Sequence, residues 1–413
     1  MKKYILMTRS IATMGGEEIY ANNKIKYISR LGYKPYVFSY INGAPITREL
    51  ENAGRYTNKY LKILPFRVPN RIRRQILEDF MSILNSEYDD EIIIESNAPE
   101  LAYWGELFAK KISAKHIVYL MDEGYDLSER LKAFFDFKYA RNELFFNLDK
   151  YVYQVITQSM TYDDSHTFDP MITNVVVDKH LDDSDPLISS TYDYVCCCFG
   201  RLEKKYVLYA AQSFCDIALK YPDKIFYFLF IGGQNSVNGI DFKKEIEVIL
   251  TNKSNVILDM RGHVFPINSE VFRHIDIAVA TAGCASIMYK NGVTTVAMDC
   301  DDGEPIGILG YNTSNNMHRN NETRYELSYY MDEVLIKKTI HPQNSIKNCA
   351  DHSTTYDNFM AAVSNSSSVE EYYDIKTLSD SSAMNSIKTI ALSIVGVDRY
   401  NELRRKYKTI ITK

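Results

Sequence analysis

The chain has 413 residues, which is too long for one ordinary hydrophobic core and predicts two or three domains. Its composition, with 46% hydrophobic and 24% charged residues, is that of a globular protein and argues against a low-complexity chain. The formal net charge of −5 provides no field that would attract a polyanion, which argues against a basic nucleic-acid-binding protein.

Cysteine usage and hydropathy predict a cytoplasmic protein. Three of the seven cysteines, Cys196, Cys197 and Cys198, are consecutive in an apolar run, where they cannot all form local disulfides. We expect them to be reduced core residues. The start of the chain, MKKYILMTRS, is interrupted by polar residues before a signal-peptide core could form, and no window holds about 18 apolar residues in a row.

The first part of the chain alternates apolar runs with amphipathic stretches. A short strand, Tyr4–Met7, precedes a loop with two glycines and a helix at Glu17–Leu31 that Gly32 ends. The next elements are a strand at Tyr36–Ser39, a strand at Glu91–Glu95, a helix at Pro99–Lys111, and strands at His116–Met121 and Val152–Thr157. This order is typical of a parallel sheet with helices on both faces. Residues 1–178 are therefore predicted to form one doubly wound, Rossmann-like domain.

The segment 179–192 is polar, contains a proline and lacks periodicity, which predicts a linker between domains. The alternation then restarts over 193–384, where a second parallel sheet is expected. Its strands are predicted at Tyr194–Phe199, Phe226–Ile231, Val256–Asp259, Ile277–Ala280 and Thr294–Met298, and its helices at Val207–Lys220, Phe242–Leu250, Ser269–His274 and Cys284–Asn291. The tail, 385–413, has helical apolar spacing and is predicted to cross back over the first domain.

Three segments at predicted strand ends could carry chemistry. Gly15 and Gly16 lie between the first strand and the first helix, where backbone N–H groups can face an anion or a sugar hydroxyl. The segment matches neither the dinucleotide-binding pattern nor the P-loop pattern. A tight turn that needs glycine is the alternative interpretation.

The second segment follows the strand that ends at Phe199 and contains Gly200, Arg201, Lys204 and Lys205. Ligands of doubly wound sheets bind at this carboxyl edge. An arginine can hold a diphosphate with two hydrogen bonds and a lysine adds a point charge, so the segment suits a nucleoside diphosphate leaving group. A solvated run of surface charges is the alternative.

The third segment, Gly283, Cys284, Ala285 and Ser286, follows another strand and opens a helix. Small residues there expose backbone N–H groups and the positive end of the helix dipole, which predicts a second phosphate contact. A small-residue helix that packs closely against the sheet is the alternative.

The chain resembles GT-B glycosyltransferases, most closely the family 4 enzymes that build surface polysaccharides. The residues that carry the resemblance are GGEEIYANNKIKYISRLGYKPYVFS, FGRLEKK, FYFLFIGGQ, HIDIAVATAGCASIMYKNGVTTVAMD and EPIGILGYNT. The resemblance implies a nucleotide-sugar donor held by the second domain and a glycan or lipid-linked acceptor held by the first, with no other cofactor. Arg201, with Lys204 or Lys205, would bind the donor diphosphate, and Gly15 and Gly16 would approach it from the first domain.

The chain departs from the family pattern at three places. Family members usually carry an extra residue between the arginine and the lysine of the segment that begins at Arg201, so either Lys204 or Lys205 could be the lysine that acts. The helix at 283–291 lacks the two glutamates, seven residues apart, that relatives use for the donor sugar and the ribose, so Glu304 becomes the nearest candidate for the ribose. Retaining relatives often carry a histidine after the strand at 117–121, where this chain has Asp122 and Glu123. Either carboxylate could act as general base in an inverting transfer, with Glu17 and Glu95 as competing candidates. A solvated strand end is the alternative.

No metal site is expected, because the histidines are scattered and the cysteines lack C-x-x-C spacing. Asp299, Asp301 and Asp302 lie close together in the sequence, but the resemblance implies transfer that does not depend on a metal. A basic amphipathic stretch combines four arginines with apolar residues, and it predicts either peripheral contact with an anionic membrane or an ordinary solvated helix face. The residues concerned are Arg67, Arg71, Arg73, Arg74, Phe66, Ile72, Ile76 and Leu77.

Two other functions fit the same sequence features. Sugar-nucleotide 2-epimerases share the architecture with two parallel sheets and bind the same donors, but they need no acceptor. A sugar-nucleotide-binding subunit without catalytic activity is the other alternative, because the paired glutamates and the histidine of the family are absent.

Overall fold

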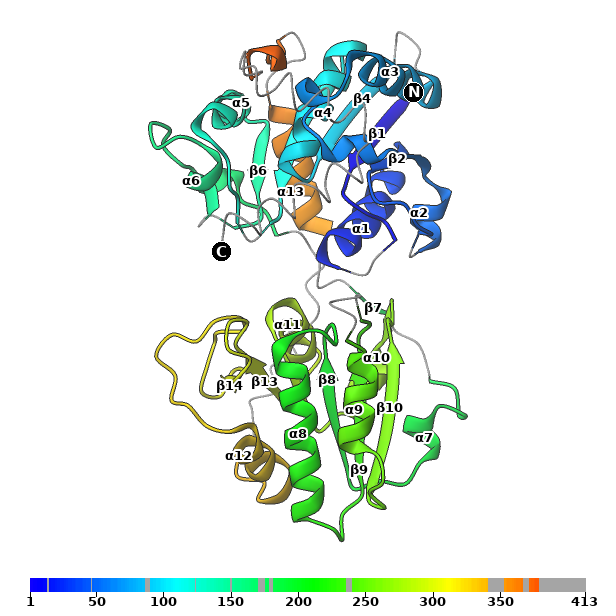
Figure 1. Cartoon of the computed structure of the whole chain (residues 1–413), viewed down its shortest axis with the longest axis vertical. Coiled ribbons are helices and arrows are strands. Elements are labelled where there is room, and N and C mark those ends of the chain that lie inside the picture. The colour runs from blue at the N-terminus through cyan, green and yellow to red at the C-terminus, as the bar shows by residue number, and fades with distance from the viewer. Residues whose placement is uncertain are drawn as a thin grey trace. The chain divides into compact units, whose positions relative to one another are not determined.

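The computed structural model divides the chain into two compact units, which we describe separately (Figure 1). Unit 1 comprises Met1–Ile172 and Asp351–Lys413, and unit 2 comprises Thr173–Ala350. The structure describes residues 1–12, 15–45, 47–85, 90–122, 124–148, 151–169, 175–177, 181–234, 240–340, 353–366 and 371–378.

Unit 1 is built on a six-stranded parallel sheet with the strand order β3-β2-β1-β4-β5-β6. Its strands are β1 (Lys2–Met7), β2 (Lys34–Ser39), β3 (Gly54–Thr57), β4 (Glu91–Ser96), β5 (Lys115–Leu120) and β6 (Leu144–Phe146). Its helices are α1 (Gly16–Arg30), α2 (Arg48–Asn52), α3 (Asn70–Leu84), α4 (Pro99–Ile112), α5 (Glu129–Ala140), α6 (Val152–Val155) and α13 (Ser353–Asn365).

The strands of unit 1 are apolar on both faces because helices cover both faces. Along β1, Tyr4 and Leu6 pack in one core with α1 and α13, whereas Ile5 and Met7 pack in a second core with α3 and α4. Successive side chains of a strand point to opposite faces, so one continuous apolar run supplies both cores.

The return of the chain to unit 1 lies earlier in the sequence than predicted. Helix α13 places Phe359 and Val363 in the core beside α1, and the turn after it places Ile375 and Leu378 in a core with α5. The predicted second domain, 193–384, therefore contains a segment that packs on unit 1. The predicted returning helix at 385–413 lies outside the described residues.

Unit 2 contains a six-stranded sheet with the order β10-β9-β8-β12-β13-β14, parallel except for the last pair. Its strands are β8 (Tyr194–Phe199), β9 (Phe226–Ile231), β10 (Val256–Gly262), β12 (Ile277–Ala280), β13 (Thr295–Met298) and β14 (Pro305–Ile308), and β7 (Val176–Val177) pairs with β11 (Ile267–Asn268). Its helices are α7 (Pro186–Ser189), α8 (Lys205–Lys220), α9 (Phe242–Leu250), α10 (Ser269–Arg273), α11 (Ala282–Lys290) and α12 (Leu327–Met331).

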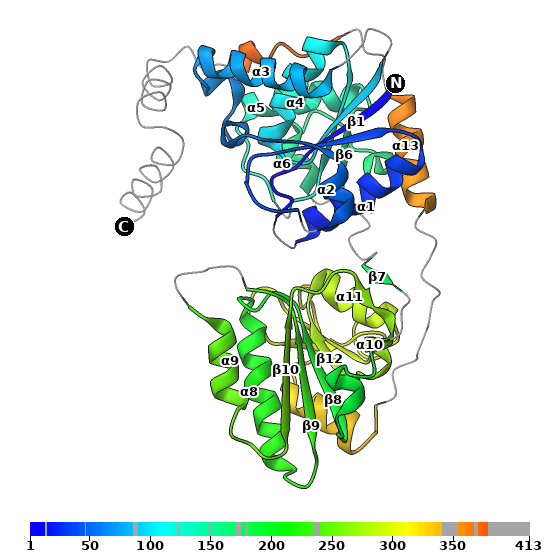
Figure 2. The ribbon, with the colours of Figure 1, turned by 90° about the vertical axis from the view of Figure 1, so that its right-hand side faces the viewer.

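In unit 2, α8 and α9 lie on one face of the sheet, and α10 and α11 lie on the other (Figure 2). The chain moves from β8 to β9 and β10 in one direction across the sheet, and from β12 to β13 in the other direction. Because crossovers between parallel strands are right-handed, this reversal places the two pairs of helices on opposite faces. Cys196, Cys197 and Cys198 lie in β8 and are buried, which confirms their prediction as core residues.

Two predictions of local structure differ from the structure. The predicted strand at Val152–Thr157 is instead the short helix α6, because Val152 and Val155, one helical turn apart, are both buried while Tyr153 is 49% exposed. The sixth strand of the sheet is β6. The predicted linker at 179–192 contains α7, whose Leu187 is fully buried, whereas the units divide at residues 172 and 173.

Each sheet has one point where the strand order switches direction: between β1 and β4 in unit 1, and between β8 and β12 in unit 2. At such a point the loops after the two strands separate, which leaves room for a ligand at the carboxyl edge. The loop after β8 holds Arg201, and the start of α11 follows β12, so two of the predicted segments flank one switch point.

Candidate functional site

The loop after β8 is fixed by close backbone packing. The N–H of Gly200 donates to the carbonyl of Ile231 at 2.9 Å, and Gly200 adopts a φ of +150° that favours glycine. A Cβ atom at Gly232 would lie 1.8 Å from the Gly200 carbonyl oxygen, so the loops after β8 and β9 approach each other more closely than any side chain would allow. This packing holds the segment that begins at Arg201 against the sheet edge.

The two lysines of this segment have different surroundings. Lys205 donates from Nζ to the carbonyl of Asp301 at 2.5 Å, so its charge is directed to the loop after β13. Lys204 is half-buried at the N-cap position of α8, and its charge, with that of Arg201, acts on the Cys284 thiol at the start of α11. Arg201 is 44% exposed and lies 3.5 Å from the Glu203 carboxylate. Lys204 and Arg201 are therefore the cations that lie near α11.

The start of α11 offers fewer backbone donors than its sequence suggests. The N–H of Ala282 donates to the carbonyl of Asn316 at 2.5 Å, and the N–H of Ala285 donates to the carbonyl of Thr281 at 3.3 Å. The Ser286 hydroxyl accepts a hydrogen bond from the Asn316 side chain at 2.7 Å. The N–H groups of Gly283 and Cys284 are the remaining donors of the first turn. Burial raises the pKa of Cys284 to about 11, although Lys204 and Arg201 oppose the increase, so the thiol is neutral at pH 7.

A small cavity of about 240 Å³ lies beside this loop, at the carboxyl ends of β9 and β10. Leu202, Gly232, Gly233, Met260 and Gly262 form its apolar and backbone lining, and three polar side chains, Gln234, Asp241 and Lys243, complete it. The cavity has the chemistry of a site for a flat apolar group next to a charged one.

Glu304, the predicted ribose contact, lies in the loop between β13 and β14. Its carboxylate is 2.7 Å from Arg324 Nη1 and 3.7 Å from Arg319 Nη2. It lines a different groove, along α12, which is treated below. A ribose contact would require Glu304 to share these partners, and that role remains a prediction.

In unit 1, the switch point holds a cluster of one arginine and three carboxylates, which we call the Arg9 cluster: Arg9, Glu17, Glu100 and Asp122. Arg9 donates from both terminal nitrogens to Asp122 at 2.5 Å each and from Nε to Glu100 at 3.2 Å. Burial opposes its charge, but the hydrogen bonds to Asp122 and the charges of Glu100 and Glu17 raise the pKa of Arg9 above its usual value. The three carboxylates give the cluster an excess of negative charge when all are ionised.

Glu17 is the carboxylate of the cluster with unusual basicity. Its Oε1 accepts hydrogen bonds from the Thr8 hydroxyl at 2.7 Å and from the Arg9 N–H at 2.8 Å, whereas Oε2 lies 3.9 Å from Arg9 Nη1, beyond hydrogen-bond distance. Burial raises the pKa of Glu17 to about 7, against the lowering effect of Arg9 and the hydrogen bonds. A carboxylate with a pKa near neutrality and one less engaged oxygen is suited to proton transfer.

The other predicted bases are placed differently. Both oxygens of Asp122 accept hydrogen bonds from Arg9, so this carboxylate is engaged within the Arg9 cluster. Glu123 lies outside the described residues. Arg9 and Glu100 were not predicted as site residues, although Arg9 lies in the loop after β1 and Glu100 lies at the start of α4, which follows β4.

Glu95 lies inside unit 1 rather than at the open edge of the sheet. It is fully buried. Its carboxylate accepts hydrogen bonds from the hydroxyl groups of Tyr4 and Tyr20 and, at 2.9 Å, from the Asn97 side chain. The carboxylate also pairs with Lys24 Nζ at 3.4 Å. Lys24 is also fully buried, and this burial lowers the pKa of Lys24 to about 8. The pair links α1 to the core that α13 completes. Glu95 therefore has the surroundings of a structural residue.

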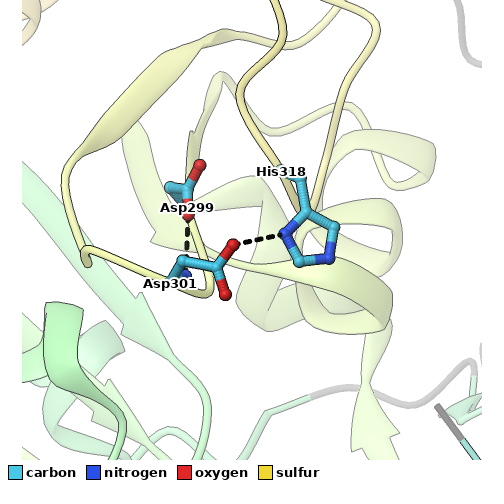
Figure 3. A group of neighbouring side chains, drawn as sticks. All are labelled: Asp299, Asp301 and His318. Carbon is cyan, nitrogen blue, oxygen red and sulfur yellow. Dashed lines mark hydrogen bonds and ion pairs between the residues drawn. The ribbon is translucent and has the colours of Figure 1, made fainter. Parts of the chain in front are cut away.

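Three side chains from the loops after β13 and β14 could converge on a cation: Asp299, Asp301 and His318 (Figure 3). Their candidate ligand atoms lie within 4.8 Å of one another, and His318 Nδ1 is 3.2 Å from the Asp301 carboxylate. Asp299 accepts backbone N–H groups on both oxygens, from Asp301 and Arg319 at 2.7 Å each. These bonds give Asp299 a role in shaping the loop.

The basic amphipathic stretch directs its apolar residues into unit 1. Ile76 is buried, Ile72 and Leu77 pack against the same core, and Phe66 packs against a neighbouring core. Arg71 and Arg74 are exposed, whereas Arg73 donates to the carbonyl of Pro65 at 3.2 Å. Within the described parts of the chain, every helix is too short or too polar to cross a bilayer.

Comparison with known proteins supports the fold. No protein-family profile and no curated protein matches the sequence. A glycosyltransferase of Rickettsia africae is similar in structure, with a TM-score of 0.56 and 14% identity over 96% of this chain and 99% of that one. A trehalose-6-phosphate synthase, OtsA, has a TM-score of 0.49 and 11% identity over 95% and 99%. A UDP-N-acetylglucosamine 2-epimerase candidate of Listeria monocytogenes has a TM-score of 0.44 and 10% identity over 96% and 97%. The predicted α/β class, with two Rossmann-like sheets of the GT-B type, is confirmed.

Proposed function

We propose that this protein is a glycosyltransferase that moves a sugar from a nucleotide-sugar donor to a glycan or lipid-linked acceptor during surface polysaccharide biosynthesis. The observation that carries the proposal is the switch point of unit 2, where Arg201, Lys204 and the start of α11 lie at one sheet edge beside the apolar cavity. A diphosphate with an attached base requires this combination of cations, backbone donors and an apolar cavity.

The chemistry follows from the charge of the leaving group. When the bond between the anomeric carbon and the diphosphate breaks, negative charge grows on the diphosphate, and Arg201 and Lys204 stabilise it more in the transition state than in the ground state. The N–H groups of Gly283 and Cys284 would add hydrogen bonds from the positive end of α11. We propose that these groups supply the electrostatic stabilisation, so that transfer does not depend on a metal ion.

In unit 1 we propose that Glu17 accepts the proton of the acceptor hydroxyl. Burial raises its pKa to about 7, near the pH at which a general base works best. Arg9 holds Asp122 and Glu100 in place and donates its backbone N–H to Glu17, which fixes the orientation of the base. Gly15 and Gly16 precede Glu17 at the start of α1, and their contact with the donor remains a prediction.

The experiment is a titration of the protein with UDP, GDP and ADP sugars, followed by assays of nucleoside diphosphate release with and without candidate acceptors. We expect Arg201→Ala to lower kcat/KM about 30- to 1,000-fold, which corresponds to about 2 to 4 kcal/mol of lost transition-state stabilisation. Lys204→Ala should have a similar but smaller effect. Lys205→Ala is the matched control, because Lys205 contacts the carbonyl of Asp301.

The same assay distinguishes the alternatives. Epimerised donor without an acceptor would identify a 2-epimerase. Donor binding that depends on Arg201, without turnover of any donor and acceptor pair, would identify a sugar-nucleotide-binding subunit. All three functions, the transferase, the epimerase and the binding subunit, place the donor diphosphate at Arg201. Activity of Arg201→Ala within severalfold of the wild type would therefore contradict this site for each of them.

A further inference from the structure

A second groove, on the α12 side of unit 2, is not used by the proposed transfer reaction. We call it the α12 groove; it has a volume of about 710 Å³. Its lining includes Tyr209 of α8, Glu304, Arg324, Tyr325 before α12, Tyr329 within α12 and Asp332 directly after it. Figure 1 shows α12 beside α8, outside the sheet that carries the switch point. Helices α8 and α12, which lie outside the sheet, therefore form part of the groove.

Two exposed tyrosines form an aromatic surface in this groove. Tyr325 and Tyr329 are 42% and 40% exposed, and their rings stack with centroids 4.6 Å apart and an angle of 18°. The fully buried Tyr330 packs edge-on against both rings, at 5.9 and 5.5 Å, and fixes their positions. Rigid aromatic groups that are held in place while still exposed are suited to contact the C–H faces of a ligand at low entropic cost.

The start of α12 is held by polar contacts from α8. The Tyr209 hydroxyl donates to the Glu326 carboxylate at 2.6 Å and accepts the N–H of Leu327 at 3.3 Å. These bonds fix the aromatic surface relative to the neighbouring helix. The groove thus keeps its shape without a ligand, as preformed binding sites do.

A buried carboxylate in the groove has an unused acceptor. Asp332 is only 8% exposed, and one oxygen pairs with Lys220, whereas the other, Oδ1, has no hydrogen-bond partner within the described part of the chain. A buried polar atom without a partner costs about 1 to 3 kcal/mol. Asp332 lines the groove, but Oδ1 itself is covered, so a ligand hydroxyl would reach this atom only after a local shift of the side chains around it. A ligand that donates a hydrogen bond to Oδ1 would favour such a shift.

The charged groups of the groove are already paired. Glu304 pairs with Arg324 and lies near Arg319, and Asp332 pairs with Lys220, so a phosphate would have to compete with these ion pairs. The ion pair between Glu304 and Arg324, at 2.7 Å, lies at the partly exposed rim and offers both acceptors and donors. Aromatic surface, paired charges and a free acceptor together suit a neutral ligand rich in hydroxyl groups.

We propose that the α12 groove binds a neutral oligosaccharide, separately from the donor site at the strand ends. This goes beyond the proposed transfer function, because binding of a glycan at this surface requires neither a donor nor turnover. A sugar ring would stack on Tyr325 or Tyr329 while its hydroxyl groups donate to Asp332 and Glu304. Such a site would hold a growing glycan on the enzyme.

The test uses the full chain on a printed glycan array, followed by titration of the neutral oligosaccharide that binds best. We expect the double variant Tyr325→Ala/Tyr329→Ala to weaken binding by about tenfold or more, the scale of losing aromatic contacts. Tyr329→Phe, which keeps the ring, and Tyr311→Ala, an exposed tyrosine outside the groove, serve as matched controls and should bind like the wild type. Asp332→Asn should weaken binding, since it replaces one acceptor oxygen by a donor.

Two further results decide the assignment. Binding that is retained in Arg201→Ala supports a site separate from the donor site, and a failure of the transfer assay would leave this result intact. The proposal is overturned if the wild type binds no neutral glycan, or if the double tyrosine variant binds as tightly as the wild type while both melt at the same temperature. Loss of glycan binding in Arg201→Ala alone would also overturn it, because the glycan would then occupy the transfer site.

Discussion

Replacing Glu17 by glutamine tests the environment of the proposed base without a substrate. The pKa of Glu17 rises from the usual 4.5 to about 7, chiefly because of burial, so folding favours the protonated form. A raised pKa adds stability that is fully present below about pH 4.5 and is lost as the pH rises through 7. At roughly 1.4 kcal/mol per pKa unit, the difference between pH 5 and pH 8 is about 2 to 3 kcal/mol.

The assay is unfolding by urea at both pH values, monitored by tryptophan fluorescence. The sequence has one tryptophan, Trp104, and it is fully buried in unit 1, so its signal reports on the unit that contains Glu17. Between pH 5 and pH 8 the wild type should lose about 2 to 3 kcal/mol of unfolding free energy relative to Glu17→Gln, because glutamine does not titrate.

Glu129→Gln is the matched control, because this carboxylate lies on the same unit and is 76% exposed. Its difference from the wild type should not change with pH on this scale. The reasoning is refuted if the Glu17→Gln difference is independent of pH, or if the wild type gains stability relative to this variant as the pH rises.

Three other predictions concern stability, metal ions and membranes. Lys24→Met should destabilise unit 1 by about 3 to 5 kcal/mol, because it leaves the buried Glu95 charge without its cation; an unchanged melting temperature would show that the pair contributes little. Dialysis against EDTA should leave the transfer rate unchanged if transfer does not depend on a metal ion, and a loss that Mg²⁺ restores would instead direct attention to Asp299, Asp301 and His318. If the basic stretch contacts membranes, the wild type should sediment with anionic liposomes and Arg71→Glu/Arg74→Glu should not. Equal sedimentation of the two proteins would show that the basic stretch is not a membrane contact.

The fold was predictable where strands are buried on both faces. The apolar runs at Tyr4–Met7 and Phe226–Ile231 are strands in the structure, because no other element of that length buries every residue. Edge strand β3 escaped prediction since its residues alternate between half-buried and exposed, and β6 has only three residues. The prediction of a strand at Val152–Thr157 was wrong because Val152 and Val155 are one helical turn apart, and a helix with this spacing buries both valines.

The two candidate sites differ in how far the sequence could locate them. Arg201 and Lys204 occupy one short segment, so a local pattern was sufficient to identify them. The Arg9 cluster joins residues that are 91 and 113 positions apart, and their meeting depends on β4 and not β2 flanking the switch point beside β1. The α12 groove depends on the packing of Tyr209 against Glu326, which no local pattern contains.

A crystal structure of the protein with UDP, GDP or ADP bound is the most direct test of the donor site. The account predicts the diphosphate within hydrogen-bond distance of Arg201 and Lys204, at the start of α11, with the base in the cavity formed by Leu202, Gly232 and Met260. A nucleotide bound elsewhere on unit 2, with Arg201 in contact only with solvent and Glu203, would contradict it.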